Sequence, residues 1–305
     1  MIENTRSIDR AANVILLIGL AFILFPLAVT LITATQSYED FVRDGMSIVP
    51  GRHLLANIRL VVETTDLPRQ ILNSLIVALL TASIKCVIAF GTAFAIVYFR
   101  LRYAGLLFAL VLVTNLLPLD LRFITTYQVA SNVMMPLNTL LEVTGLARAI
   151  EALTGHHPHY ELNILNTYFG LVAPTLANGT GTFLFRQHFR TMPADLSKAA
   201  RMDGAGPLRF MIDILMPLSK STFAALFVVM FLSGWTGYLW PLVAASTPEM
   251  QTAVVGLARL SPGDPGVVPN YPAIMAGALM VCIIPLALIA LLQRHIVRGF
   301  TLTEK

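Results

Sequence analysis

Residues 190–219 read RTMPADLSKAARMDGAGPLRFMIDILMPLS, and this polar stretch between two apolar runs holds the pattern that decides the fold. Pro193 suits the first turn of a helix, where a missing N–H costs no hydrogen bond. Gly204 can end that helix in a left-handed conformation. Pro207 can begin a second helix, and Pro217 can end it. The stretch therefore predicts two short helices joined by a glycine break.

The first predicted helix carries a small apolar face. Leu196, Ala199 and Ala200 stand at positions i, i+3 and i+4, so they share one side of a helix. Such a face can sit in a groove on a soluble partner. It can equally belong to an amphipathic loop that lies on a membrane surface. The pattern alone leaves both interpretations open.

The second predicted helix repeats this spacing. Phe210 and Ile214 are four residues apart and are expected to share a face. Arg209 and Asp213 have the same spacing and opposite charges, so we expect them to form an ion pair.

The composition of the chain indicates contact with lipid. Of 305 residues 56% are hydrophobic and 12% are charged, whereas about 25% are charged in an ordinary soluble domain. The mean hydropathy is +0.73. The net charge of +4 is small, and no nucleic-acid partner is expected. We therefore predict an all-α membrane protein.

Six apolar runs are candidates for transmembrane helices, because lipid offers no hydrogen bonds to an irregular backbone. The first run is longer than the apolar core of a typical signal peptide, which spans about 7–15 residues, so it is expected to be retained. The predicted spans are 13–34, 71–98, 104–120, 166–185, 222–245 and 272–292.

The basic residues predict the orientation of the chain. Most lysines and arginines fall in the end segments and the 186–221 loop, which lie on one side of a six-span protein. The positive-inside rule places that side, with both termini, in the cytoplasm. The predicted division is a cytoplasmic N-terminus (1–12), the first span (13–34), a periplasmic loop (35–70), a core with five spans (71–292) and a cytoplasmic C-terminus (293–305).

The 186–221 loop resembles the EAA loop of ABC importer permeases. Ala199-Ala200, Asp203-Gly204-Ala205 and Pro217-Leu218 match that motif, while Lys198 replaces its glutamate and Ser221-Thr222 replaces its closing proline. The resemblance implies the six-span type I ABC importer fold and a helix that docks on an ATPase subunit. The residues it assigns to this coupling are Leu196, Lys198, Ala199, Ala200, Asp203, Gly204, Ala205, Phe210 and Pro217.

A wider resemblance runs nearly end to end. Segments such as Ile23-Leu-Phe-Pro-Leu, Ala93-Phe-Ala-Ile-Val-Tyr-Phe-Arg and Gly234-Trp are similar to the permeases of sn-glycerol-3-phosphate importers, in the carbohydrate uptake group. The resemblance implies a second permease, an ATPase dimer, a periplasmic binding protein, and a substrate that is glycerol-3-phosphate or, in some members, a glycerophosphodiester.

Catalytic motifs do not support an enzyme. No GxxxxGK[ST] phosphate-binding loop occurs in the sequence, so the chain needs an ATPase partner, and ATP and Mg²⁺ are expected there. We expect no cofactor or metal on this chain. The other classes considered are a neutral sugar or polyol permease of the same fold, a secondary transporter and a membrane scaffold. The last two leave the coupling loop unexplained.

The segment 136–165 departs from the family pattern. Leu146, Ile150 and Leu153 form a short amphipathic pattern on the predicted periplasmic side. The segment can contact the binding protein or be a tolerated surface insertion. His156, His157 and His159 follow. Their spacing allows a metal site, but a solvated loop is the interpretation we prefer.

Three charged residues are candidates for the substrate pathway. Lys85 lies deep in the predicted span 71–98, where a charge costs roughly 2.5–3.5 kcal/mol on insertion scales. A lysine there suits a phosphate-bearing solute, or it pairs with a polar group of a partner permease. Asp120 and Arg122 stand at the outer end of the third span, where they can line the periplasmic mouth or anchor the helix at the interface.

Overall fold

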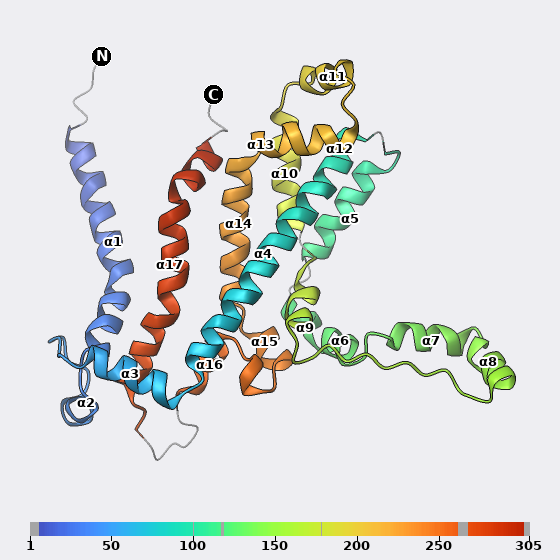
Figure 1. The fold of residues 1–305 in the computed structure, drawn as a ribbon. Coiled ribbons are helices and arrows are strands. Elements are labelled where there is room, and N and C mark those ends of the chain that lie inside the picture. The colour runs from blue at the N-terminus through green and yellow to red at the C-terminus, as the bar shows by residue number, and fades with distance from the viewer. Residues whose placement is uncertain (1–5, 100, 117–118, 178, 262–267, 302–305) are drawn as a thin grey trace. The chain divides into compact units, whose positions relative to one another are not determined.

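The computed structural model describes residues 6–99, 101–116, 119–177, 179–261 and 268–301, and the regular elements among them are all helices, with no strand (Figure 1). The predicted all-α class is confirmed. The chain divides into two units, residues 1–68 with 256–284 and residues 69–255 with 285–305. Each unit is described separately.

The first unit is built around α1 (Arg6–Ala34), whose apolar side chains are exposed along its length. It also contains α2 (Tyr38–Asp44), α3 (Leu54–Thr64) and the first half of α17 (Tyr271–Thr301). Asn57 of α3 donates hydrogen bonds to the carbonyls of Ala34, at 2.9 Å, and Gln36, at 2.8 Å. Because the last carbonyls of a helix have no partner inside it, Asn57 satisfies the end of α1. The predicted periplasmic loop 35–70 is thus largely helical.

The second unit is organised by three helices, α4 (Leu67–Tyr98), α10 (Gly179–Thr191) and α14 (Lys220–Trp235). Glycines lie where these helices meet. A Cβ on Gly181 would come within 2.9 Å of the Ala89 Cβ, and one on Gly234 within 3.1 Å of the Ala78 Cα. Small residues let helix backbones approach closely where no hydrophobic force acts between helices. The small residues at the start of α10 therefore pack against α4.

α5 (Ala104–Leu116) packs beside α10 (Figure 1). Shorter elements close one end of this unit: α6 (Leu119–Ser131), α9 (Tyr168–Val172), the 3₁₀ turn η1 (Ala173–Thr175), α15 (Leu239–Ala244), η3 (Pro248–Met250) and α16 (Ala253–Arg259), which continues into the first unit.

A polar network on α4 holds the loop that follows α15. The buried Asn73 donates to the carbonyls of Glu249, at 2.7 Å, and Gln251, at 2.9 Å, and accepts a hydrogen bond from the Tyr168 hydroxyl at 2.8 Å. The Trp240 indole donates to the Gly170 carbonyl at 3.2 Å. These bonds satisfy carbonyls that the short helices leave open.

Three helices of the described part are long and apolar enough to cross a membrane: Asp9–Ala34 within α1, α4, and Tyr271–Gln293 within α17. A further candidate is α14 together with the helical segment 207–218, which meet at a bend of 78°. The other predicted spans differ from the structure, because α5 ends at Leu116, η1 interrupts 166–185, and residues 236–238 separate α14 from α15. Pro174 lies in η1, where the predicted span 166–185 is interrupted, and its missing N–H cannot continue an α-helix. The count of six spans stays a prediction.

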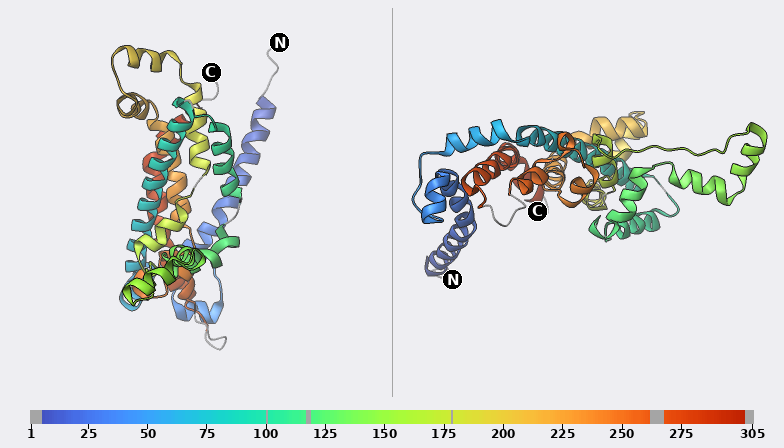
Figure 2. Two further views of the ribbon diagram at one scale, coloured as in Figure 1. Left: turned by 90° about the vertical axis from the view of Figure 1, so that its right-hand side faces the viewer. Right: turned by 90° about the horizontal axis from the view of Figure 1, so that it is seen from below.

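The 136–165 segment forms an arm of two helices, α7 (Met135–Val143) and α8 (Leu146–Thr154), which extends away from the helices of its unit (Figure 1, Figure 2). Hydrogen bonds close its base: Val133 N–H to Leu162 O at 2.9 Å and Ile164 N–H to Ala130 O at 3.0 Å. The amphipathic pattern of α8 leaves Leu153 87% exposed.

Histidines and glutamates join the arm's two helices. His157 contacts Glu142 of α7 at 2.7 Å and Glu151 of α8 at 2.9 Å, while His159 contacts Glu161 at 3.2 Å. Among the described residues no group of three His, Cys, Asp or Glu side chains is arranged to hold a metal ion. Hydrogen bonds first to Glu151 and then to Glu142 raise the pKa of His157.

We predict that the arm loosens as pH rises. A raised histidine pKa means that the bridge stabilises the arm fully below the usual pKa of about 6.5 and that this contribution is lost as pH rises through the raised value. Hydrogen exchange of α8, corrected for the intrinsic rate, should show lower protection at high pH. His157→Gln should lower protection at about pH 6, and His159→Gln serves as the control. Equal effects of both substitutions would contradict the bridge.

Candidate functional site

The first predicted loop helix is α11 (Asp195–Met202). It begins after Pro193, whose carbonyl accepts a hydrogen bond from the Leu196 N–H at 3.2 Å. Asp195 and Lys198 form an exposed ion pair at 2.9 Å. Exposed pairs of this kind contribute about 0–1 kcal/mol, so the ends of the helix matter more than this pair.

Gly204 ends α11 as predicted. Its φ of +72° is in the left-handed region, which favours glycine. The Ala205 N–H donates to the Ala200 carbonyl at 2.8 Å, and the Gly204 N–H to the Arg201 carbonyl at 3.1 Å. This pair of bonds is a Schellman motif, which satisfies the last carbonyls of the helix. The motif fixes the direction in which the chain leaves α11.

The faces of α11 differ in exposure. Ala200 is its only buried residue, at 4% exposure, whereas Leu196 is half-buried. Lys198 and Ala199 are exposed, and Met202 is 87% exposed. Of the three residues predicted to form one apolar face, only Ala200 lies inside the unit, and Ala199 remains free on its outer side.

The second predicted helix is longer and less regular than expected. It consists of α12 (Pro207–Arg209), the π-helix η2 (Phe210–Leu215) and α13 (Met216–Leu218). The Met216 N–H donates to the Met211 carbonyl, five residues back. Pro217 stands within α13, so the expectation that it ends the helix is wrong by one residue. Because Pro217 has no N–H, it cannot donate a hydrogen bond to a carbonyl of the preceding turn. This accounts for the change from α-helical to π-helical hydrogen bonding.

The π-helix changes which residues share a face. The predicted Arg209–Asp213 ion pair is confirmed at 3.3 Å. The expected Phe210–Ile214 pair is wrong, because Phe210 and Leu215 are the buried residues. The π-helical hydrogen bonds, which run over five residues, widen the turn, so the ordinary helical spacing no longer identifies the buried residues.

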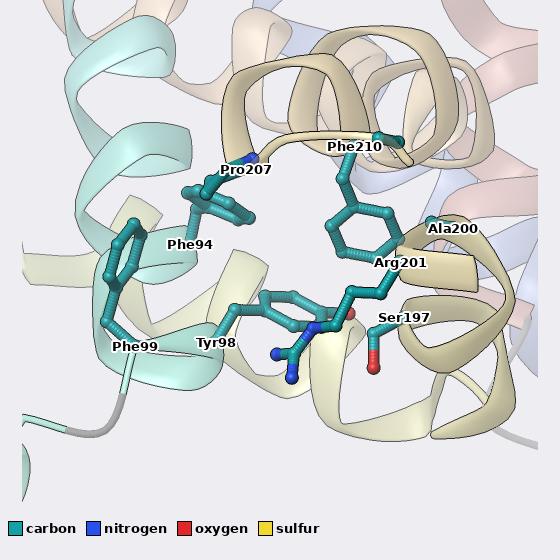
Figure 3. Close-up of a pocket in the computed structure, with 9 residues that line it drawn as sticks. Phe94, Tyr98, Phe99, Ser197, Ala200, Arg201, Pro207 and Phe210 are labelled. Atoms are coloured by element: carbon teal, nitrogen blue, oxygen red, sulfur yellow. The ribbon is translucent and has the colours of Figure 1, made fainter. Parts of the chain in front are cut away.

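A pocket of about 210 Å³ lies between α11 and the end of α4. Figure 3 shows Phe94 and Tyr98 of α4 with the following Phe99 on one side, and Phe210 and Ala200 on the other, with Arg201 at the edge. This pocket was not predicted from the sequence. The one feature that could have indicated it is the run of aromatic residues at the end of the predicted span 71–98.

Lys85 lies in the interior of the second unit and is 8% exposed. It shares a stripe of α4 with Thr81 and Ala89, at i−4 and i+4. Thr81 adjoins Gly234 of α14, and Ala89 adjoins Gly181 of α10. The stem of Lys85 therefore points to the side of α4 that α10 and α14 cover. Across the described part of the chain, no hydrogen bond or ion pair of its ammonium is found. A charged side chain within an apolar helix of this length is costly to insert into a membrane, which favours a functional role.

Asp120 and Arg122 belong to the backbone of α6, but their side chains lie outside the described residues. The structure therefore gives no contact between them and Lys85. One turn further along α6, Thr125 and Thr126 line a cavity of about 430 Å³. Its other walls include Phe169 and Pro174 of the broken span. This cavity was not predicted from the sequence, because the span 166–185 was expected to be one unbroken helix.

Three comparisons place the chain among known proteins. Residues 87–302 match the family described as "Binding-protein-dependent transport system inner membrane component". The chain is 38% identical, over the full length of both proteins, to the sn-glycerol-3-phosphate transport system permease protein UgpE of Agrobacterium fabrum. It is 36% identical, also over full lengths, to the UgpE proteins of Pectobacterium atrosepticum and Rhizobium meliloti.

A solved structure shares the fold. It is the crystal structure of a bacterial ABC transporter involved in the import of the acidic polysaccharide alginate. The TM-score is 0.70 at 18% identity, and the match covers 96% of this chain and 98% of that one. At this identity the similarity concerns the fold alone, and it confirms the type I importer architecture expected from the sequence.

Proposed function

The chain belongs to the family of binding-protein-dependent transport system inner membrane components, and we propose that the solute it carries is sn-glycerol-3-phosphate. It is a multi-pass transmembrane permease of an ABC importer. The observation that carries the substrate proposal is the 36–38% identity, over full lengths, to permeases named for this solute. Glycerophosphodiesters are the related substrates of the proposal.

We propose the remaining parts of the importer from the family to which the chain belongs. A second permease completes the pathway, a periplasmic binding protein delivers the solute, and an ATPase dimer binds ATP and Mg²⁺. The chain itself is a non-catalytic translocation subunit, since its sequence contains no phosphate-binding loop. The concentration of basic residues in the end segments and the 186–221 loop supports cytoplasmic termini.

We propose that α11 couples ATP hydrolysis to transport. Its outer side presents Lys198, Ala199, Met202 and Asp203, which no part of the described chain covers. An apolar Met202 beside small residues fits a groove on a soluble partner, in the helix-in-groove manner. Ala205 and Pro217 belong to the turns that carry this helix. ATP-driven closure of the ATPase dimer would move α11, and the helices would alternate between outward and inward access.

Lys85 is the proposed contact for the phosphate group. Its ammonium can donate charge-assisted hydrogen bonds to phosphate oxygens. Lys85 is buried on α4, the helix that contacts both α10 and α14. This location supports a contact with the solute at the place where these helices would move during transport. Asp120 and Arg122, at the start of α6, are the proposed charged residues of the outer mouth.

Uptake of labelled sn-glycerol-3-phosphate tests the substrate. Cells that lack this gene should lose uptake, and restoring the gene should restore it. Glycerophosphodiesters should compete with the label, and maltose should not. If uptake does not depend on the gene, the substrate is instead a neutral sugar or polyol, and Lys85 has a structural role.

Replacing Lys85 tests its contact with phosphate. Loss of a charged hydrogen bond of about 2 kcal/mol should lower the kcat/KM of uptake about 30-fold in Lys85→Met. The protein should still insert, because the change removes a buried charge. Lys220→Met, at the exposed start of α14, serves as the matched control. Equal kinetics of Lys85→Met and the control would exclude the phosphate contact.

Replacing Gly204 tests the coupling helix. A valine would be forced into a left-handed conformation that costs an L-residue roughly 1–2 kcal/mol, although space for its Cβ is open. We expect normal membrane levels of Gly204→Val and reduced co-purification of the ATPase. Gly206→Val is the control, since Gly206 is extended, with φ −70° and ψ 168°, and is equally open. Normal ATPase recovery and uptake in Gly204→Val would refute the assignment.

A further inference from the structure

Seven aromatic side chains form one buried cluster near the loop. They come from three bundle helices and from the π-helix: Phe90, Phe94 and Tyr98 of α4, Phe185 and Phe189 of α10, Phe223 of α14, and Phe210 of η2. Phe90 stands at the centre, with ring centroids 5.2 Å from Phe185, 5.3 Å from Phe189 and 4.8 Å from Phe223. The cluster thus joins all three helices that organise the unit.

Phe210 connects the loop to this cluster. It is 6% exposed, and its ring centroid lies 5.2 Å from that of Tyr98 and 6.4 Å from that of Phe94. Tyr98 in turn lies 5.9 Å from Phe189 of α10. Among the ring contacts of the described residues, those of Phe210 are the ones that reach from the 195–218 segment into the helices.

The coupling helix itself packs loosely on α4. The pocket of about 210 Å³ separates the two, and Ala200 is the only residue of α11 that is buried. In Figure 3 Phe210 faces Phe94 and Tyr98 across the inner side of this pocket. A movement of α11 can therefore be absorbed by the pocket unless Phe210 passes it on. Close-packed aromatic rings have low compressibility and do transmit displacement.

The cluster reaches toward the proposed phosphate contact. Phe90 follows Lys85 by five residues on α4, about 7.5 Å along the helix axis. Ala89 lies against Gly181 at the start of α10, so a shift of α10 against α4 alters the surroundings of Lys85. The π-helix that carries Phe210 fits this role, since π-helical turns are frequent at functional sites.

We infer that Phe210 and Tyr98 are positioning residues that transmit the movement of α11 to α4 and α10, and thereby link ATP hydrolysis to the exposure of the pathway. The inference rests on the proposed function as a permease driven through α11. It does not depend on which solute is carried.

The test uses the full importer, with partner permease, ATPase and binding protein, reconstituted in liposomes. The measured quantity is solute transported per ATP hydrolysed, together with the stimulation of ATP hydrolysis by the binding protein. Phe210→Leu keeps an apolar side chain and removes the ring. We expect a fall of about fivefold or more in the transport ratio, with ATP hydrolysis retained.

Two controls separate transmission from packing. Phe231→Leu removes an equally buried ring of α14, which stacks on Trp235 at 5.7 Å and lies outside the cluster. It should leave the transport ratio unchanged. Tyr98→Phe keeps the ring and should behave as the original protein, whereas Tyr98→Leu should lower the ratio as Phe210→Leu does. The Tyr98 pair decides the question if Phe210→Leu does not assemble.

Each outcome bears on one proposal. A normal ratio in Phe210→Leu, or an equal fall in Phe231→Leu, overturns the transmission role. Absence of glycerol-3-phosphate uptake by the unsubstituted importer overturns the substrate instead. In that case, stimulation of ATP hydrolysis by the binding protein still measures transmission, and its loss in Phe210→Leu and Tyr98→Leu but not in Tyr98→Phe supports it.

Discussion

The close approach of α10 and α14 to α4 is the constraint on which the second unit depends. Gly181 and Gly234 leave no space for a Cβ, so the three backbones meet at distances that larger residues would prevent. In lipid, such contacts replace the hydrophobic force that joins helices in water. The same contacts bury Lys85 between two glycine crossings and bring the aromatic rings of the three helices into one cluster.

Broken helices impose a second requirement, because every interruption leaves backbone carbonyls and N–H groups without partners. The structure meets it with side chains from distant helices. Asn73 of α4 bonds to the loop after α15, Trp240 bonds to Gly170, and Asn57 bonds to the end of α1. An unpaired buried group costs several kcal/mol in a medium without water. These polar side chains therefore permit the irregular backbone that lines the cavity beside α6.

The loop combines a rigid end with a loose interior. The Schellman motif at Gly204 fixes how α11 leaves the chain, and the ion pair of Arg209 and Asp213 lies on the exposed side of the next helix. Between α11 and α4, by contrast, the pocket leaves room for displacement. The direction of α11 is fixed, while its contact with α4 leaves space for movement. Phe210 is therefore the aromatic side chain that connects the loop to α4. In the proposed coupling, Phe210 is the side chain through which α11 acts on α4 and α10.

The sequence by itself determined the all-α membrane class, the glycine stop at Gly204 and the Arg209–Asp213 pair, because these follow from composition and from spacing within one helix. The family followed from the resemblance of its motifs to known permeases. Only the tertiary structure decided which predicted spans are interrupted, since the side chains that satisfy a broken helix come from residues such as Asn73, far away in the chain. It likewise decided that Phe210 and Leu215 are the buried residues of the second loop helix, because a π-turn changes the period on which helical patterns rest. The neighbours of Lys85 and the aromatic cluster arise from contacts between helices, and no local pattern contains that information.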